Sequence, residues 1–141
     1  MGQNARISAL ENVGRVMQLS RSFRFDDPDV AVAATSVKIP LGKPLPAGAV
    51  VLGVVCDVTD DWTDGSTGTF ALDVGDGTTD DLFTPTQVVL DGGVALRTQS
   101  VIVPAGGVQV TVEFVSSVNL STLTGGAADL QVLYVVPKEQ E

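Results

Sequence analysis

The sequence predicts an all-β protein: a single β-sandwich or jelly roll of about eight strands, with an extended N-terminal arm. The chain has 141 residues, which fits one domain, and 44% of them are hydrophobic, which is enough to form a core. Valine-rich segments with a period of two recur along the chain, and turn residues separate them at roughly the 8–12-residue spacing of sandwiches. No sustained helical period follows residue 14.

The arm is assigned to residues 1–14 and the β-domain to residues 15–141. Ser8 and Glu11 have the spacing of a helix capping box, and Gly14 ends that pattern. A helix this short is marginal unless it docks on another surface, so an arm is expected. No apolar run reaches the roughly 18 residues of a membrane span, and no signal peptide is expected.

Eight segments carry the strand pattern. Residues 15–25 place Met17, Leu19 and Phe23 on one face, which Arg21 interrupts. Residues 49–59 are apolar on both faces, which is typical of a central strand. The predicted strands lie in residues 15–25, 30–41, 49–59, 69–74, 86–90, 95–103, 108–117 and 129–136.

An acidic, glycine-containing stretch, "ALDVGDGTTDDLF", lies between two of these strands. An EF-hand loop that began at Asp73 would place Gly75 and Gly77 where ligand oxygens are needed. A phosphate loop would need a further glycine, a following helix and fewer carboxylates. We interpret the stretch as a polar turn, in which glycines adopt positive φ and aspartates bind loop backbone. Calcium binding of a different type stays open.

Catalytic residue types are scarce. The chain has no histidine, which is the usual general base and the commonest metal ligand. Cys56 lies on an apolar strand face and is expected to be a buried small hydrophobe. A glycosidase-like carboxylate pair is available only among Asp57, Asp60, Asp61 and Asp64. We therefore predict no enzyme activity, no catalytic residues, no cofactor and no metal.

The charge is uneven along the chain. The net charge is −9, which argues against a nucleic-acid partner. Residues 1–25 nevertheless carry four of the eight basic residues and only one of the 17 acidic residues. Trp62, in "DDWTDG", is the only tryptophan. It is expected either to be exposed for a sugar or protein partner or to fold back over an open end of the sandwich.

Two stretches carry a family resemblance. "LPAGAVVLGVVCDVT", and after a polar loop "GTFALDVGDGTTDDLF", resemble small virion proteins of tailed bacteriophages over roughly residues 40–90. The resemblance implies a capsid decoration (head auxiliary) protein: a non-catalytic homotrimer that binds the major capsid protein on the outer shell. It implies assembly in the host cytoplasm, with no membrane partner. The alternative is a carbohydrate- or receptor-binding domain of a head or tail fibre.

A decoration protein implies a partner-binding arm. The residues expected to contact the shell are Arg6, Arg15, Arg21 and Arg24, with Trp62 as an additional anchor. An arm that orders on docking contributes binding energy, and trimeric symmetry multiplies weak contacts. On this hypothesis, removal of residues 1–25 leaves the β-domain folded and abolishes binding to the particle.

Overall fold

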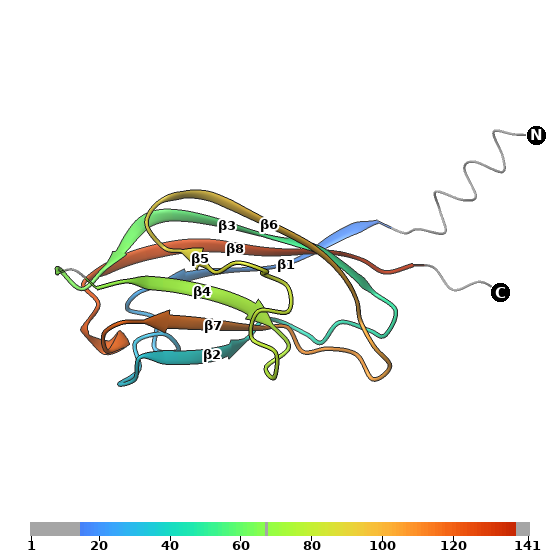
Figure 1. Cartoon of the computed structure of the whole chain (residues 1–141), viewed down its shortest axis with the longest axis horizontal. Helices are drawn as coiled ribbons and strands as arrows, with labels where there is room; N and C mark the ends of the chain where they lie inside the picture. The colour runs from blue at the N-terminus through green and yellow to red at the C-terminus, as the bar shows by residue number, and fades with distance from the viewer. Residues whose placement is uncertain (1–14, 67, 138–141) are drawn as a thin grey trace, which may run out of the picture.

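The computed structural model describes residues 15–66 and 68–137 (Figure 1), in which two four-stranded sheets pack face to face. The first sheet has the strand order β1-β8-β3-β6 and the second has the order β2-β7-β4-β5. A single turn of 3-10 helix, Leu120–Thr122, precedes the last strand. The strands are β1 Val16–Arg24, β2 Ser36–Pro40, β3 Val50–Thr63, β4 Phe70–Gly75, β5 Val88–Val89, β6 Gly93–Ile102, β7 Thr111–Ser116 and β8 Gly125–Val135.

The topology is that of a jelly roll. All strand pairs are antiparallel, and every connection except that from β4 to β5 crosses from one sheet to the other. Paired sheets of this kind are the jelly-roll solution for an eight-stranded chain. The predicted all-β sandwich of about eight strands is confirmed. The arm predicted for residues 1–14 lies outside the described residues.

The core lies between the sheets because each strand alternates inward and outward residues. In β3, the fully buried Val51, Val54 and Cys56 face inward. Cys56 is a buried hydrophobe, as predicted, and burial raises the pKa of its thiol to about 11. β3 pairs with both β8 and β6 and is therefore a central strand, also as predicted.

Three aromatic side chains connect the two sheets. Phe114 of β7 packs edge-on against Phe23 of β1, with ring centroids 5.0 Å apart. Its other neighbour is Trp62 of β3, in a stacked arrangement with centroids 5.2 Å apart. Such pairs add about 0.5–1.5 kcal/mol each beyond the area they bury. The chain has few aromatic residues, and these three are placed where the two layers meet.

Several strand boundaries differ from the prediction; β8, for example, begins at Gly125 rather than at residue 129. β3 continues to Thr63, so the segment expected to be a polar loop around Trp62 is strand. β2 is restricted to Ser36–Pro40, and the residues before it form turns in which the Ala31 amide donates to the Asp27 carbonyl at 2.8 Å. β3 continues there with irregularities: Thr59, Asp60 and Asp61 are all exposed, and the register against β8 shifts between Val58 and Asp60 and again between Asp60 and Thr63.

β1 belongs to the sandwich along its whole length. Its residues pair with β8 from Val16–Val135 to Arg24–Ala127, and Phe23 is fully buried. The expectation that residues 1–25 can be removed from an intact domain is therefore wrong for residues 16–24. A deletion that keeps every described strand must end before Val16.

Arginines at inward positions occupy both edge strands of the first sheet. Arg21 of β1 is opposite the buried Leu130, and Arg97 of β6 is opposite the buried Val54. Arg21 lies over the ring of Phe23 at 4.7 Å, and Arg97 donates to the carbonyls of residues 86 and 87 at 3.1 Å. Charged residues that point inward at a sheet edge oppose pairing with another strand.

Candidate functional site

The predicted partner-binding arginines are in different settings. Arg15 is exposed just before β1, and Arg6 lies outside the described residues. Arg21 binds Asp29 at 2.7 Å and lies 3.6 Å from Asp27. Arg24 binds Asp26 at 3.1 Å. Two of the four arginines thus pair with aspartates of the turn that follows β1, and this pairing neutralises part of their charge.

Trp62 is in the core rather than on the surface. Only 5% of the residue is exposed, and its indole stacks on Phe114. Its Nε1 is the one buried side-chain nitrogen or oxygen without a hydrogen-bond partner among the described residues. The placement agrees with the expectation that the ring folds back against the sandwich. The carbohydrate-binding alternative relied on an exposed Trp62, and the buried position of the ring does not support it.

The acidic stretch after β4 is a turn, as predicted. The Asp76 carboxylate accepts hydrogen bonds from the amides of Thr78 at 2.9 Å and Thr79 at 2.6 Å, and these bonds lower its pKa. Gly77 has a φ of 89°, as expected for such a turn. Gly75 has no positive φ. It is required instead because a Cβ there would collide with the backbone carbonyl oxygen of Thr79.

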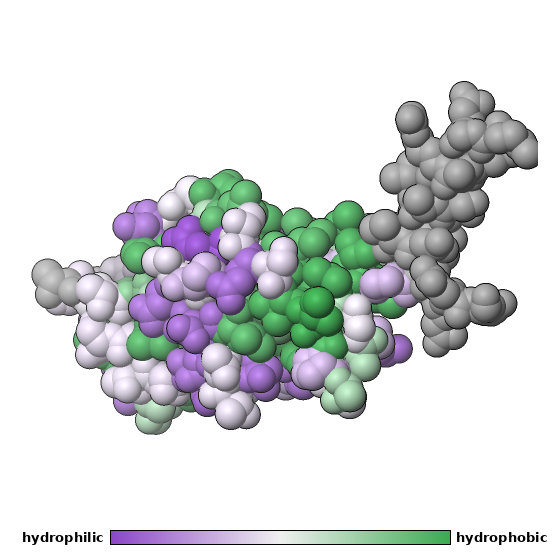
Figure 2. Space-filling view, turned by 45° about the vertical axis from the view of Figure 1, so that its right-hand side comes forward, coloured by the Kyte–Doolittle hydropathy of each residue, from purple (hydrophilic) through white to green (hydrophobic). Residues whose placement is uncertain are grey.

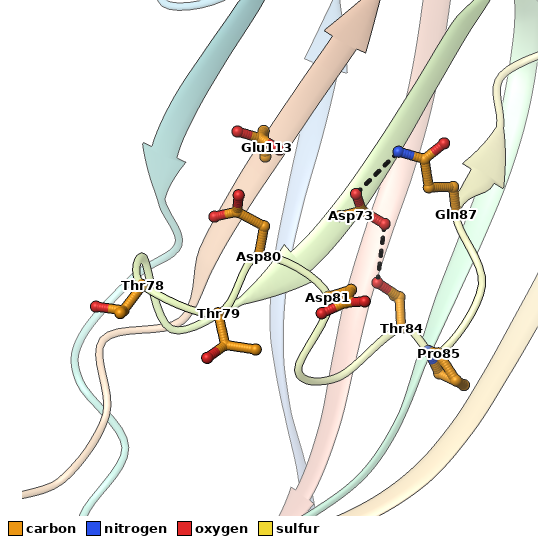
Figure 3. Close-up of a pocket in the computed structure, with 9 residues that line it drawn as sticks. All are labelled: Asp73, Thr78, Thr79, Asp80, Asp81, Thr84, Pro85, Gln87 and Glu113. Carbon is orange, nitrogen blue, oxygen red and sulfur yellow. Dashed lines mark hydrogen bonds between the residues drawn. The ribbon is translucent and has the colours of Figure 1, made fainter.

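A pocket of about 510 Å³ lies beside this turn (Figure 3). Asp73 hydrogen-bonds to Gln87 at 3.0 Å and to Thr84 at 3.5 Å, as the dashed lines show. Lys38 lies 3.0 Å from Asp80, which neutralises part of the negative charge at the margin. The residues that line the pocket are Asp73, Thr78, Thr79, Asp80, Asp81, Thr84, Pro85, Gln87 and Glu113.

Two carboxyl groups of this pocket, those of Asp73 and Glu113, have raised pKa values. Burial, and then the charges of Asp81 and Asp80, raise the pKa of Asp73, although its hydrogen bonds oppose the shift. Burial and the charge of Asp80 raise the pKa of Glu113. Within residues 15–66 and 68–137, no three acidic or cysteine side chains are grouped so that they could hold a metal ion. The same residues include no helix that is long and apolar enough to cross a membrane.

The outer face of the first sheet carries an apolar row that crosses all four strands. Val16 of β1 is opposite Val135 of β8, which is opposite Val50 of β3, which is opposite Ile102 of β6. The neighbouring residues Val51 of β3 and Tyr134 of β8 belong to the core, so the row lies on the outer side of the sheet. Its two middle members are largely covered, since Val135 is only 7% exposed and Val50 is half-buried. Ile102 is 71% exposed and Val16 is 62% exposed. We call these four residues the apolar row.

Further apolar residues extend this surface along the sheet. The half-buried Val55 of β3 is opposite Leu96 of β6, which is 58% exposed. In Figure 2, hydrophobic residues gather toward the end of the molecule where β1 begins and β8 ends. Thr98 and Ser100 lie between Leu96 and Ile102 along β6, so the exposed apolar residues form a group interrupted by polar ones. Exposed apolar residues that gather at one end of a molecule are typical of an interaction site.

The same outer face is acidic farther from the apolar row. Asp57 of β3 is directly opposite Asp129 of β8. Like charges in this position destabilise a sheet, and the one compensating contact is the hydrogen bond that Ser22 donates to Asp129 at 2.7 Å. Asp60 and Asp61 are exposed farther along β3. Val94 of β6, which is 69% exposed, is also opposite Asp57, so this part of the outer face combines acidic and apolar residues, whereas the apolar row has no charged member.

Sequence reasoning missed this surface. Val50, Val55 and Leu96 all belong to predicted strands, but the sequence does not show which apolar face of a strand is outward. The four members of the apolar row come from four separate segments, and only the register brings them together. The available signal was that residues 49–59 have more apolar positions than one core face requires.

Comparison with known proteins identifies the fold. No protein-family model and no curated protein matches the chain. Among solved structures, a chain of the cyanophage Pam1 capsid asymmetric unit superposes with a TM-score of 0.58 and 22% identity, over 89% of this chain and 87% of that one. A chain of the Helicobacter pylori bacteriophage KHP30 capsid gives a TM-score of 0.57 and 18% identity, over 89% and 91%. At these identities the likeness shows a shared jelly-roll fold.

Proposed function

We propose that the protein is a structural virion protein that binds the outer surface of a phage capsid as a trimer and stabilises the shell. The observation that carries the proposal is the fold shared along nearly the whole length of chains from two phage capsid structures. Both matches cover most of each chain, so the comparison is with whole subunits of similar size rather than with a domain of a larger protein.

The surface of the domain supports a role in assembly. Val16, Leu96 and Ile102 are exposed apolar side chains on the outer face of the first sheet that a partner can cover. A protein that binds a repetitive shell gains from many weak contacts, because its copies are held close together there. We assign the major capsid protein as the partner, with assembly in the host cytoplasm and a final location on the virion surface.

The arm contributes to binding in this proposal, but with fewer residues than the sequence predicted. Arg21 and Arg24 pair with aspartates of their own domain, so Arg6 and Arg15 are the basic residues assigned to contact the shell. An arm that orders only when it docks contributes contacts at an entropic cost.

Co-sedimentation with empty shells of the major capsid protein tests the proposal. The full-length chain is expected to pellet with the shells, and the chain lacking residues 1–14 is expected to remain folded and bind at least about tenfold more weakly. Lys43→Ala, which changes an exposed basic residue of the domain, is the control and should bind like the full-length chain. If the full-length chain stays in the supernatant at every concentration, the capsid assignment is wrong.

A further inference from the structure

We infer that copies of this chain associate through the apolar end of the outer face of the first sheet. This surface consists of the apolar row together with Val55 and Leu96. The inference deepens the proposed function, because it names the residues that would join the subunits of the trimer. The charge and the size of the surface both favour a second copy of the chain as its binding partner.

The charge distribution favours a second copy. The chain has a net charge of −9, so two copies repel each other unless they meet at an uncharged surface. The apolar row contains no charged residue and is complementary to an identical row. Asp57 and Asp129 lie on the same outer face, and two fully overlapping sheets would bring these aspartates together. Copies are therefore expected to overlap only at the apolar end, with these aspartates apart.

The sheet edges direct association to the face. β1 and β6 are the two edge strands of the first sheet, and each carries an inward arginine, Arg21 or Arg97. Both side chains are held by contacts within the chain, to Asp29 and to the residue 86 and 87 carbonyls respectively. An added strand would compete with this arrangement. We therefore expect this sheet to contact another copy through its exposed outer face.

The size of the surface sets the strength of the contact. Four strands about 4.8 Å apart and three rows about 6.8 Å apart set an upper limit of about 400 Å² for this face, because Thr98 and Ser100 lie between Leu96 and Ile102 and Val135 is nearly buried. Two such faces bury at most about 800 Å² in total, which is below the roughly 1,200 Å² of stable complexes. The association is thus expected to be weak and reversible in solution and to depend on concentration.

Sedimentation equilibrium over a wide concentration range tests the inference. The full-length chain is expected to increase in mass with concentration. Ile102→Lys places a charge in the apolar row at a residue that is 71% exposed, so the fold should tolerate it, and it should weaken association by at least about tenfold. Val89→Lys is the matched control: it adds the same charge at a valine that is 55% exposed on the second sheet, and it should associate like the unchanged chain.

Several outcomes would overturn the inference. One is a full-length chain that stays monomeric at the highest concentration reached. Another is an equal loss of association in Ile102→Lys and Val89→Lys, which would indicate a general charge effect. Loss of association on deletion of residues 1–14, with Ile102→Lys unaffected, would assign the contact to the arm. If the chain binds shells as a monomer, this inference is wrong and the capsid role stands. If the chain forms an oligomer that depends on Ile102 but does not bind shells, the inference stands and the capsid role is wrong.

Discussion

Single residues in this protein are constrained mainly by close packing between backbones. Gly75 ends β4 where the chain turns back, and the Thr79 and Asp80 backbone occupies the space that a side chain would need. Gly126 of β8 has the Trp62 indole in the equivalent place. Gly75 lies beside the acidic turn and Gly126 lies beside the lone tryptophan. Both positions need glycine because a side chain would not fit there, and not because of a chemical role.

Gly75→Ala is expected to lower the free energy of unfolding by about 1–3 kcal/mol or more, because the obstructing atoms are backbone and the turn must shift. Urea unfolding followed by fluorescence measures the change. Gly125→Ala is a suitable control, because the added Cβ would lie at ordinary contact distances from its nearest neighbours: 3.4 Å from the Thr63 methyl, 3.8 Å from the Asp61 carbonyl oxygen and 3.9 Å from an Asp60 carboxylate oxygen. Equal stabilities of the two variants would show that the close approach at Gly75 is relieved at no cost.

At the scale of strands, β1 is the element whose role changed most between sequence and structure. It carries basic residues like the arm before it, yet it pairs with β8 along its length and buries Phe23 against Phe114. The arginine that interrupts its apolar face closes the side of the sandwich by binding Asp29. A strand at a sheet edge can therefore be basic and still be integral to the fold.

Phe23→Ala should cost about 3–5 kcal/mol, because it leaves a cavity between the sheets where the aromatic ring packed. Thermal unfolding measures the effect, and Ser20→Ala, at an exposed outward position of the same strand, should change stability little. In the same assay, loss of residues 1–14 should be tolerated and loss of residues 1–25 should not. A chain lacking residues 1–25 that unfolds at the temperature of the full-length chain would contradict the assignment of β1 to the core.

The strands could be predicted because the period of two is a local property. Each of the eight predicted segments overlaps one strand of the structure. The burial of Trp62 was one of two expectations, but its place in a strand could not be predicted, since the aspartates around it are typical of a loop and β3 passes them with two shifts of register. The apolar row could not be predicted either, because it depends on how strands far apart in sequence pair. The acidic turn was predicted because its hydrogen bonds are local.

The whole molecule combines an acidic body with an uncharged apolar row on the outer face of its first sheet. Repulsion between bodies opposes association, and the apolar contact favours it. Salt separates the two contributions, because screening shortens the range of the repulsion from about 10 Å at 0.1 M to about 3 Å at 1 M and leaves the apolar contact intact.

Raising sodium chloride from about 0.1 to 1 M should therefore strengthen self-association of the full-length chain. Sedimentation equilibrium at each salt concentration gives the association constant. The association constant of Ile102→Lys should increase much less with salt than that of the full-length chain, because the substitution disrupts the apolar contact. A decrease in association with salt would mean that ion pairs, and not the apolar row, hold the copies together.

The pairing of Val16 with Val135 has a practical consequence for protein engineering. The first and last strands are antiparallel neighbours, so the chain enters and leaves the sandwich at adjacent positions. A short hairpin linker could join these two strands, and new ends could be opened in an exposed turn such as that at Gly106. A circular permutant of this kind would keep every strand pair while moving both ends to another part of the surface.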